Sequence, residues 1–185
     1  MKPVPGRELT AMKSTSFLAS GCAVQPGPRP RGGRMVRPAE LGELVRAVVG
    51  APESWRSIVR FSSDSRWFRR LALADDYEIW LLTWLPGQRT GFHDHGDACG
   101  AFAVARGELR ESLAAPGRSR VRHRTASADS VTSFGGQHLH EVSNAAAAPA
   151  ISVHAYSPPL SAMRRYEMTD SGLALVRTER AEVDW

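Results

Sequence analysis

Residues 87–107 read Gly-Gln-Arg-Thr-Gly-Phe-His-Asp-His-Gly-Asp-Ala-Cys-Gly-Ala-Phe-Ala-Val-Ala-Arg-Gly, and this stretch decides the fold. His93 and His95 flank a single aspartate in an expected strand that follows a Pro-Gly turn. Because side chains alternate along a strand, both imidazoles should point to the same face. Two neutral imidazoles side by side are natural ligands for a divalent metal. The stretch therefore predicts a strand that carries part of a metal site.

Short runs with β character continue on both sides of this stretch, and turn residues such as Pro86-Gly87 and Arg106-Gly107 separate them. The expected strands are Tyr77–Leu85, Gly100–Arg106, Glu108–Leu113, Val121–Thr125, Leu139–Val142, Ile151–Tyr156 and Leu173–Val176. Many short strands without helices between them favour an antiparallel sandwich or barrel. The sequence predicts a fold that is mainly all-β.

A helix and a tail precede the expected strands. Pro38 suits a first helical turn, Leu41 and Leu44 begin an apolar repeat at helical spacing, and Gly50 ends it. Residues 1–36 contain runs rich in glycine, proline and arginine, which cannot hold a regular element. We therefore expect a flexible basic tail over residues 1–36 and a single domain over residues 37–185.

The charge distribution argues against nucleic acid as a partner. The 185-residue chain has 24 cationic and 19 anionic residues, a net charge of +5. Residues 1–37 hold seven of the cations and one anion, so the remaining residues are close to neutral. A domain that follows a phosphate backbone should cluster its cations on the folded surface. We expect no nucleic-acid partner.

The cysteine content and the hydropathy favour a cytoplasmic protein. Cys22 and Cys99 are the only cysteines, so a disulfide framework cannot form and a reducing interior is expected. No apolar run approaches the roughly 20 residues that a membrane span needs. We expect a cytoplasmic protein that is a monomer and has no membrane partner.

The spacing of glycines and histidines resembles the first motif of the cupin superfamily. Gly87, His93, His95 and Gly107 fit that motif, which normally has a glutamate ligand at the position of Gly100. The second motif is recognisable from His140 and Asn144. The resemblance implies a cupin jelly-roll barrel with a short N-terminal helical segment, in which His140 lies beside His93 and His95. Spacing alone leaves His138 open as the third ligand, because it shares a strand face with His140.

The segment Ile151-Ser-Val-His-Ala-Tyr-Ser-Pro-Pro-Leu160 carries a more specific signal. Ser152, His154 and Tyr156 alternate, so they share one strand face and can pass a hydrogen bond along it. Together with the histidines, this row and the following Ser-Pro-Pro resemble the thiol dioxygenases, and the cysteine dioxygenase family in particular. The resemblance covers about residues 66–167.

The resemblance implies a role for each of these residues. His93, His95 and His140 would hold Fe(II), and Tyr156 would direct its hydroxyl at the substrate and O2. His154 and Ser152 would orient that tyrosine. An arginine in an aromatic-x-Arg context would bind the substrate carboxylate, and Trp67-Phe68-Arg69 matches it, with Arg70 expected on the opposite face. A guanidinium binds a carboxylate bidentately.

Two further features are specific to this chain. Cys99 is one residue away from the position, here Gly100, at which some family members carry a cysteine bonded to the tyrosine. A shift of one residue turns a strand side chain to the other face, so we expect no crosslink. The resemblance also implies that the Ser157–Pro158 peptide bond is cis.

The expected activity is the oxidation of L-cysteine with O2 to cysteine sulfinic acid. Three neutral histidines without a carboxylate suit an anionic ligand such as a thiolate, and metal binding deprotonates a thiol. One alternative is a dioxygenase of 3-mercaptopropionate or another small thiol. A second alternative is a non-catalytic cupin module that binds a metal, although the row of Ser152, His154 and Tyr156 argues against it.

Overall fold

The helical segments come first in the chain, and the strands that follow form two sheets. The computed structural model describes residues 34–181. Helix α1 spans Pro38–Val49, and two short 3-10 turns follow at Pro52–Ser54 and Arg56–Ile58. The strands are β1 (Phe68–Leu73), β2 (Glu78–Trp84), β3 (Phe92–Asp94), β4 (Cys99–Arg106), β5 (Glu108–Leu113), β6 (Arg122–Ser127), β7 (Val131–Phe134), β8 (His140–Ser143), β9 (Ala150–Ser157), β10 (Ala162–Thr169) and β11 (Gly172–Arg180).

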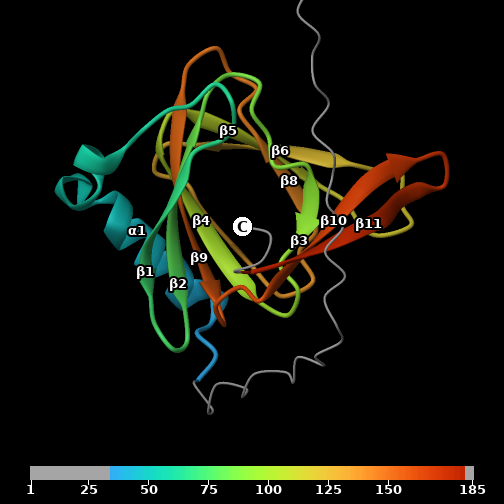
Figure 1. Cartoon of the computed structure of the whole chain (residues 1–185), viewed down its shortest axis with the longest axis horizontal. Helices are drawn as coiled ribbons and strands as arrows, with labels where there is room; N and C mark the ends of the chain where they lie inside the picture. Colours follow the sequence, from blue (N-terminus) through green and yellow to red (C-terminus); the bar gives the residue numbers. More distant parts are fainter. Residues whose placement is uncertain (1–33, 182–185) are drawn as a thin grey trace, which may run out of the picture. The chain divides into compact units, whose positions relative to one another are not determined.

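The two sheets form a barrel. One has five strands in the order β1-β2-β9-β4-β7, and the other has six in the order β11-β10-β3-β8-β5-β6. The strands pair antiparallel throughout these two sheets. In Figure 1 the sheets face each other across a common interior, and the β10–β11 hairpin extends away from it. This arrangement confirms the predicted mainly β jelly-roll barrel with a short N-terminal helix.

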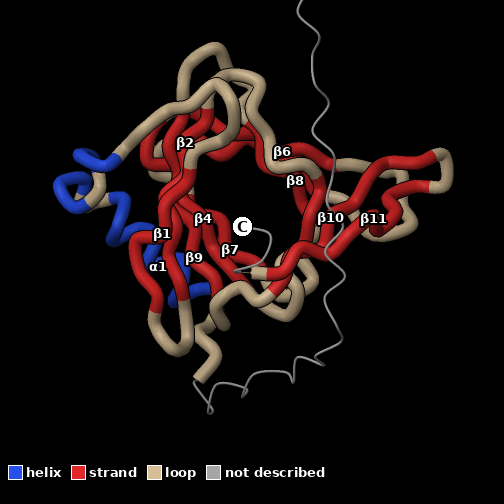
Figure 2. Tube along the Cα trace, viewed as in Figure 1, coloured by secondary structure: helices blue, strands red, loops and turns tan. Residues whose placement is uncertain are grey.

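Helix α1 packs on the outer face of the five-stranded sheet, against β4, β7 and β9 (Figure 2). Pro38 begins the helix, where its missing N–H costs no hydrogen bond, and the helix buries Leu41 and Val45 completely. Gly42 faces β7 so closely that a Cβ there would lie 2.8 Å from the Oγ of Ser133. Glycine at this position therefore allows the close approach of helix and sheet.

Strand β9 is buried on both faces, and its two faces differ in chemistry. Ile151, Val153 and Ala155 pack in the apolar cluster beneath α1. The alternate residues, from Ser152 to Tyr156, point into the barrel interior, where Tyr156 joins the other apolar cluster. The central strand of the five-stranded sheet thus separates an apolar layer from a polar one.

The expected strands are all present, with boundaries shifted by a few residues. Strands β1, β7 and β10 have no counterpart among the strands predicted from the sequence. Strand β10 carries Arg164, Arg165 and Glu167, which interrupt any apolar alternation. It forms because both of its edges are paired, with β3 on one side and β11 on the other.

The first described residues are attached to the barrel. The backbone N–H of Val36 donates to the Oγ of Ser157 at 2.9 Å, and its carbonyl accepts from the Sγ of Cys99 at 3.2 Å. The predicted tail over residues 1–36 lies outside the described residues up to residue 33, as does Cys22. Within residues 34–181, no helix combines the length and the apolar character needed to cross a membrane.

Candidate active site

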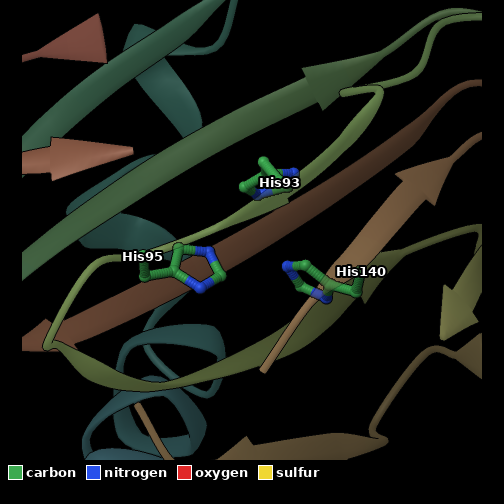
Figure 3. Close-up of side chains that lie close together, drawn as sticks. All are labelled: His93, His95 and His140. Atoms are coloured by element: carbon green, nitrogen blue, oxygen red, sulfur yellow. The ribbon is translucent and has the colours of Figure 1, made fainter. Parts of the chain in front are cut away.

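Three histidines converge inside the barrel (Figure 3). His93 lies on β3, His95 directly follows that strand, and His140 begins β8, where it pairs with His93 across the sheet. All three side chains are buried, and one ring nitrogen from each lies within 4.8 Å of the others. The structure thus brings together the three residues that the sequence selected as metal ligands.

The ring nitrogens of this cluster fit a metal ion. The Nδ1 of His93 donates to the carbonyl of Gly91 at 3.0 Å, and the Nδ1 of His140 donates to Glu111 at 2.7 Å, which leaves both Nε2 atoms available. Neither ring nitrogen of His95 has a hydrogen-bond partner among the described residues. Because buried polar atoms are rarely left unpaired, a ligand to His95 is expected at this place.

Burial keeps these imidazoles neutral. Removal from water lowers the pKa of His93 and His95 well below the ordinary value. Repulsion from neighbouring histidines, His140 in both cases, lowers the pKa of each further. Burial also lowers the pKa of His140, although the hydrogen bond to Glu111 opposes this effect. Neutral imidazoles are the form that binds a metal.

Glu111 is a site residue that the sequence analysis missed. It lies on β5, is completely buried, and accepts hydrogen bonds from His138 and His140 at 2.7 Å and from the Nε of Arg124. Burial alone would raise the pKa of its carboxyl, but these three donors outweigh burial and lower it. Glu111 was hidden because one isolated glutamate in a strand has no distinguishing pattern.

The position of the usual cupin glutamate, Gly100, has no room for a side chain. A Cβ at Gly100 would lie 2.6 Å from the ring of Phe134 on the neighbouring strand. The adjacent Cys99 packs in the cluster beneath α1, away from the histidines, as its strand position predicted. Asp94 also points away, and it accepts hydrogen bonds from Arg164 at 3.0 Å and from Tyr166 at 2.8 Å.

The polar row of β9 is hydrogen-bonded along its length. The Nε1–H of Trp84 donates to the Oγ of Ser152 at 2.9 Å. The same Oγ lies 2.8 Å from the Nε2 of His154, and the Nδ1 of His154 lies 3.4 Å from the hydroxyl of Tyr156. Burial lowers the pKa of His154 to about 3 and raises the pKa of Tyr156, so both are neutral near pH 7.

The predicted orientation of Arg69 is wrong. Arg69 is exposed and pairs with Leu81, whose side chain packs beneath α1, so Arg69 is on the outer face of β1. Arg70 is on the inner face, with its guanidinium over the ring of Trp80 and 3.6 Å from Glu78. The alternation of the two arginines was predicted, but its phase depends on the pairing of β1 with β2, which the sequence does not reveal.

Two other arginines line the cavity beside the histidines. This cavity has a volume of about 110 Å³ and is lined by Arg66, Phe68, Trp80, Leu82, Thr90, His93, His140, Val142, His154, Tyr156, Leu160, Met163 and Arg165. Arg165 is paired with Glu179 at 2.6 Å. Arg66 stacks over Trp84, has no carboxylate partner among residues 34–181, and its buried Nε has no hydrogen-bond partner there. Burial, followed by the charge of Arg165, lowers the pKa of Arg66 to about 10.

The remaining histidines lie outside the three-histidine cluster. His138 stacks on Phe134 and meets His140 edge to face, with ring centroids 4.6 Å apart, and both rings share Glu111 as a partner. His123 is exposed on β6, and its Nδ1 lies 2.9 Å from the Oγ of Ser112. The Ser157–Pro158 peptide bond is cis, as the resemblance implied.

Comparison with known proteins identifies the family. A family model described as cysteine dioxygenase type I matches residues 34–169, which include the histidine cluster and the β9 row. The chain belongs to the cysteine dioxygenase type I family. A relative from Danio rerio, cysteine dioxygenase type 1, is 26% identical over 142 residues, which cover 69% of each chain.

Solved structures similar to this family member are more distant in sequence. The protein TT1209 from Thermus thermophilus has a TM-score of 0.50 and 16% identity, over 56% of this chain and 93% of the other. A Klebsiella pneumoniae protein with a double-stranded β-helix domain has a TM-score of 0.48 and 21% identity, over 65% and 87%. Membership in the cysteine dioxygenase family implies a cupin dioxygenase with a metal cofactor, a small-molecule substrate and O2.

Proposed function

We propose that the protein is an Fe(II)-dependent thiol dioxygenase that converts L-cysteine and O2 to cysteine sulfinic acid. The observation that carries this proposal is one small cavity that three groups of side chains share. It is lined by His93 and His140 of the histidine cluster, by Tyr156 and by Arg66, whose guanidinium has no carboxylate partner among residues 34–181. A cysteine substrate has a thiolate for the metal and a carboxylate for the cation.

His93, His95 and His140 would hold the iron. Three neutral ligands leave the charge of the ion uncompensated in its immediate surroundings, which favours an anionic substrate. When bound, Fe(II) would supply the redox chemistry needed to oxidise a thiolate with O2. The apolar lining from Leu82, Val142 and Met163 would exclude bulk water from the reacting atoms.

Arg66 would bind the substrate carboxylate in place of the predicted Arg69. Its guanidinium is held by stacking on Trp84 and by a hydrogen bond from Nη1 to the carbonyl of Arg89 at 3.3 Å. Arg165 also lines the cavity, but Glu179 already neutralises it. A carboxylate could pair with Arg66 at small cost, because the guanidinium is already partly removed from water.

Tyr156 would donate a hydrogen bond to the substrate or to O2. An indole N–H can only donate, so the Oγ of Ser152 accepts from Trp84 and can donate its own proton to the Nε2 of His154. The Nδ1–H of His154 then faces the oxygen of Tyr156, whose own proton is left to point into the cavity. This row would therefore fix the tyrosine as a donor.

3-Mercaptopropionate is a second candidate substrate. No acidic side chain is among the residues that line the cavity, so the described part of the protein has no obvious partner for the ammonium group of cysteine. A thiol carboxylate without an amine would satisfy Arg66 equally well. Cysteine remains the first proposal because its amine can bind the metal.

The test is to load the purified protein with Fe(II) without oxygen and then measure O2 uptake with a panel of thiols. We expect uptake with cysteine, a sulfinic acid product that gains two oxygen atoms, and little uptake with cysteamine, which lacks the carboxylate. Absence of uptake with every small thiol would contradict the proposal and favour a binding module. We further propose a cytoplasmic monomer, whose oligomeric state light scattering after size-exclusion chromatography can test.

A further inference from the structure

Glu111 belongs to β5, the second strand from one edge of the six-stranded sheet. It lies in the middle of β5, opposite Arg124 on β6 and Val142 on β8. Its side chain is completely buried, whereas the side chain of Arg124 is 45% exposed. Burying a carboxylate costs free energy unless hydrogen bonds and opposite charges compensate it. The contacts of Glu111 therefore show what its carboxylate does in the interior.

The contacts of Glu111 orient one of the proposed metal ligands. Its Oε1 lies 2.7 Å from the Nδ1 of His140 and 2.7 Å from the Nε2 of His138, and its Oε2 accepts from Arg124. An ionised carboxylate only accepts hydrogen bonds, so the Nδ1 of His140 must carry the proton. The Nε2 of His140 is then the unprotonated nitrogen that faces His93 and His95.

The other two histidines of the cluster have no such support. The Nδ1 of His93 donates to a neutral backbone carbonyl, that of Gly91. His95 has no hydrogen-bond partner among the described residues. His140 is therefore the member of the cluster that is joined to a negative charge.

We propose that Glu111 is the positioning residue of His140 and holds its ring in the Nδ1–H tautomer. Through this hydrogen bond Glu111 also places behind His140 the negative charge that the three-histidine set lacks. This inference rests on the proposed metal site. A carboxylate behind a ligating histidine fixes the ring orientation and raises the basicity of the ligand. It would act on metal affinity without touching the substrate.

A second metal site at Glu111, His138 and His140 is a weaker explanation of the same residues. Their facing atoms also lie within 4.8 Å of one another. However, these atoms already pair as donor and acceptor at 2.7 Å, and the second carboxylate oxygen is occupied by Arg124. The group is satisfied as a hydrogen-bond network.

The tautomer can be measured on the metal-free wild-type protein. Long-range ¹⁵N–¹H NMR spectra of histidine-labelled protein distinguish a protonated Nδ1 from a protonated Nε2. We expect His140, assigned by comparison with His140→Gln, to carry its proton on Nδ1. A proton on Nε2 would overturn the proposal, and this experiment needs neither a metal nor a variant of Glu111.

The second test compares Glu111→Gln with Arg124→Gln. Both variants break the Glu111–Arg124 ion pair, but only the first removes the charge behind His140. Affinity for Fe(II), and for Co(II) as an oxygen-stable probe, is measured by competition with a chelator. We expect Glu111→Gln to weaken binding by about 10- to 100-fold, and Arg124→Gln to weaken it by less than about 3-fold.

Several results would overturn the proposal. Equal losses in the two variants would make Glu111 a structural partner of Arg124, and unchanged affinity in Glu111→Gln would remove its role altogether. A wild-type protein that binds neither metal would end both this proposal and the metal site. A protein that binds metal with the expected dependence on Glu111 but oxidises no thiol would contradict the proposed function alone.

Discussion

At its central strand β9 the five-stranded sheet is buried on both faces, yet the two faces serve different purposes. Beneath α1, the sheet contributes Leu81, Val153 and Ala155 to a cluster with Leu41 and Val45 from the helix. On the interior face, the same strands present Ser152, His154 and Tyr156, and the opposite sheet contributes the histidines and Glu111. One face is an ordinary apolar core, and the other is a core with a polar site inside it.

The difference shows where a ligand belongs. A buried polar group is costly unless it is hydrogen-bonded, and nearly all interior polar groups described above meet this condition within the protein. Among residues 34–181, both ring nitrogens of His95 and the Nε of Arg66 are buried near the cavity without a hydrogen-bond partner. These atoms lie on the interior side, where the proposed metal and the substrate carboxylate would complete their contacts.

The largest expected effect separates metal binding from packing. His95→Ala should abolish iron retention, because only two of the three imidazole ligands remain to bind the ion. Leu81→Ala, on the other face of the sheet, should retain iron. Leu81→Ala should instead lower the free energy of unfolding by about 2–5 kcal/mol, because it leaves a cavity beneath α1. Metal analysis after gel filtration and chemical denaturation of the metal-free protein measure the two effects.

The choice of the third ligand can be tested in the same experiment. His140→Ala should lose iron as His95→Ala does, and His138→Ala should keep most of it. The opposite result, with full iron in His140→Ala and none in His138→Ala, would show that the assignment of the third ligand is wrong.

The next effect concerns the hydroxyl on the interior face. Tyr156→Phe should fold and bind iron, but turnover or the coupling of O2 uptake to product should fall by about 10²-fold, the usual cost of one positioned donor. Tyr166→Phe is the matched control, because its hydroxyl bonds Asp94 and lines no part of the cavity. Steady-state O2 uptake and product analysis compare the two; equal activity in both variants would reduce the β9 row to a structural feature.

A smaller effect distinguishes the two arginines on opposite faces. Arg66→Ala should raise the Michaelis constant for cysteine by at least about tenfold, because a charge-assisted pair with the carboxylate is lost. Arg69→Ala should leave that constant unchanged, since Arg69 is exposed on the outer face. If Arg69→Ala raises the Michaelis constant more than Arg66→Ala does, Arg69 binds the substrate carboxylate, as the sequence predicted, and the proposed role of Arg66 is wrong.

The sequence predicted the parts of the site that depend on strand alternation within one segment. The His-x-His pair and the row of Ser152, His154 and Tyr156 were found because a period of two fixes their relative faces. Arg66 and Glu111 were missed because their positions depend on which strands pair and in which register. Arg69 was chosen wrongly for the same reason, since its face is set by the partner Leu81 on β2.

The same limit applies to the fold. The strands with turn signals and apolar runs were predicted, whereas β10 is held by its two neighbours, and its arginines serve Asp94 and Glu179 across the sheet. Contacts between distant segments are not visible in a local pattern. Family resemblance supplied the pairing of His140 with His93, which local patterns leave open.

The smallest expected effect uses pH to compare a buried histidine of the interior with an exposed one. His154 has a pKa of about 3 in the folded protein because burial disfavours its charged form. The unfolded chain binds a proton at this residue below about pH 6.5, and the folded protein does not until about pH 3. The stabilising contribution of neutral His154 is therefore complete above pH 6.5 and declines as the pH falls toward 3, by about 1.4 kcal/mol per pH unit.

The test is denaturation of the metal-free protein at pH 7, 6 and 5. As the pH falls, the free energy of unfolding should decrease less steeply in His154→Gln than in the wild type, because the variant lacks the one proton that the unfolded wild type takes up at residue 154. His123→Gln, at an exposed position, should parallel the wild type. If the stability of His154→Gln depends on pH as steeply as that of the wild type, His154 takes up a proton in the folded protein as readily as in the unfolded chain. The interior face would then be more accessible to solvent than its buried side chains indicate.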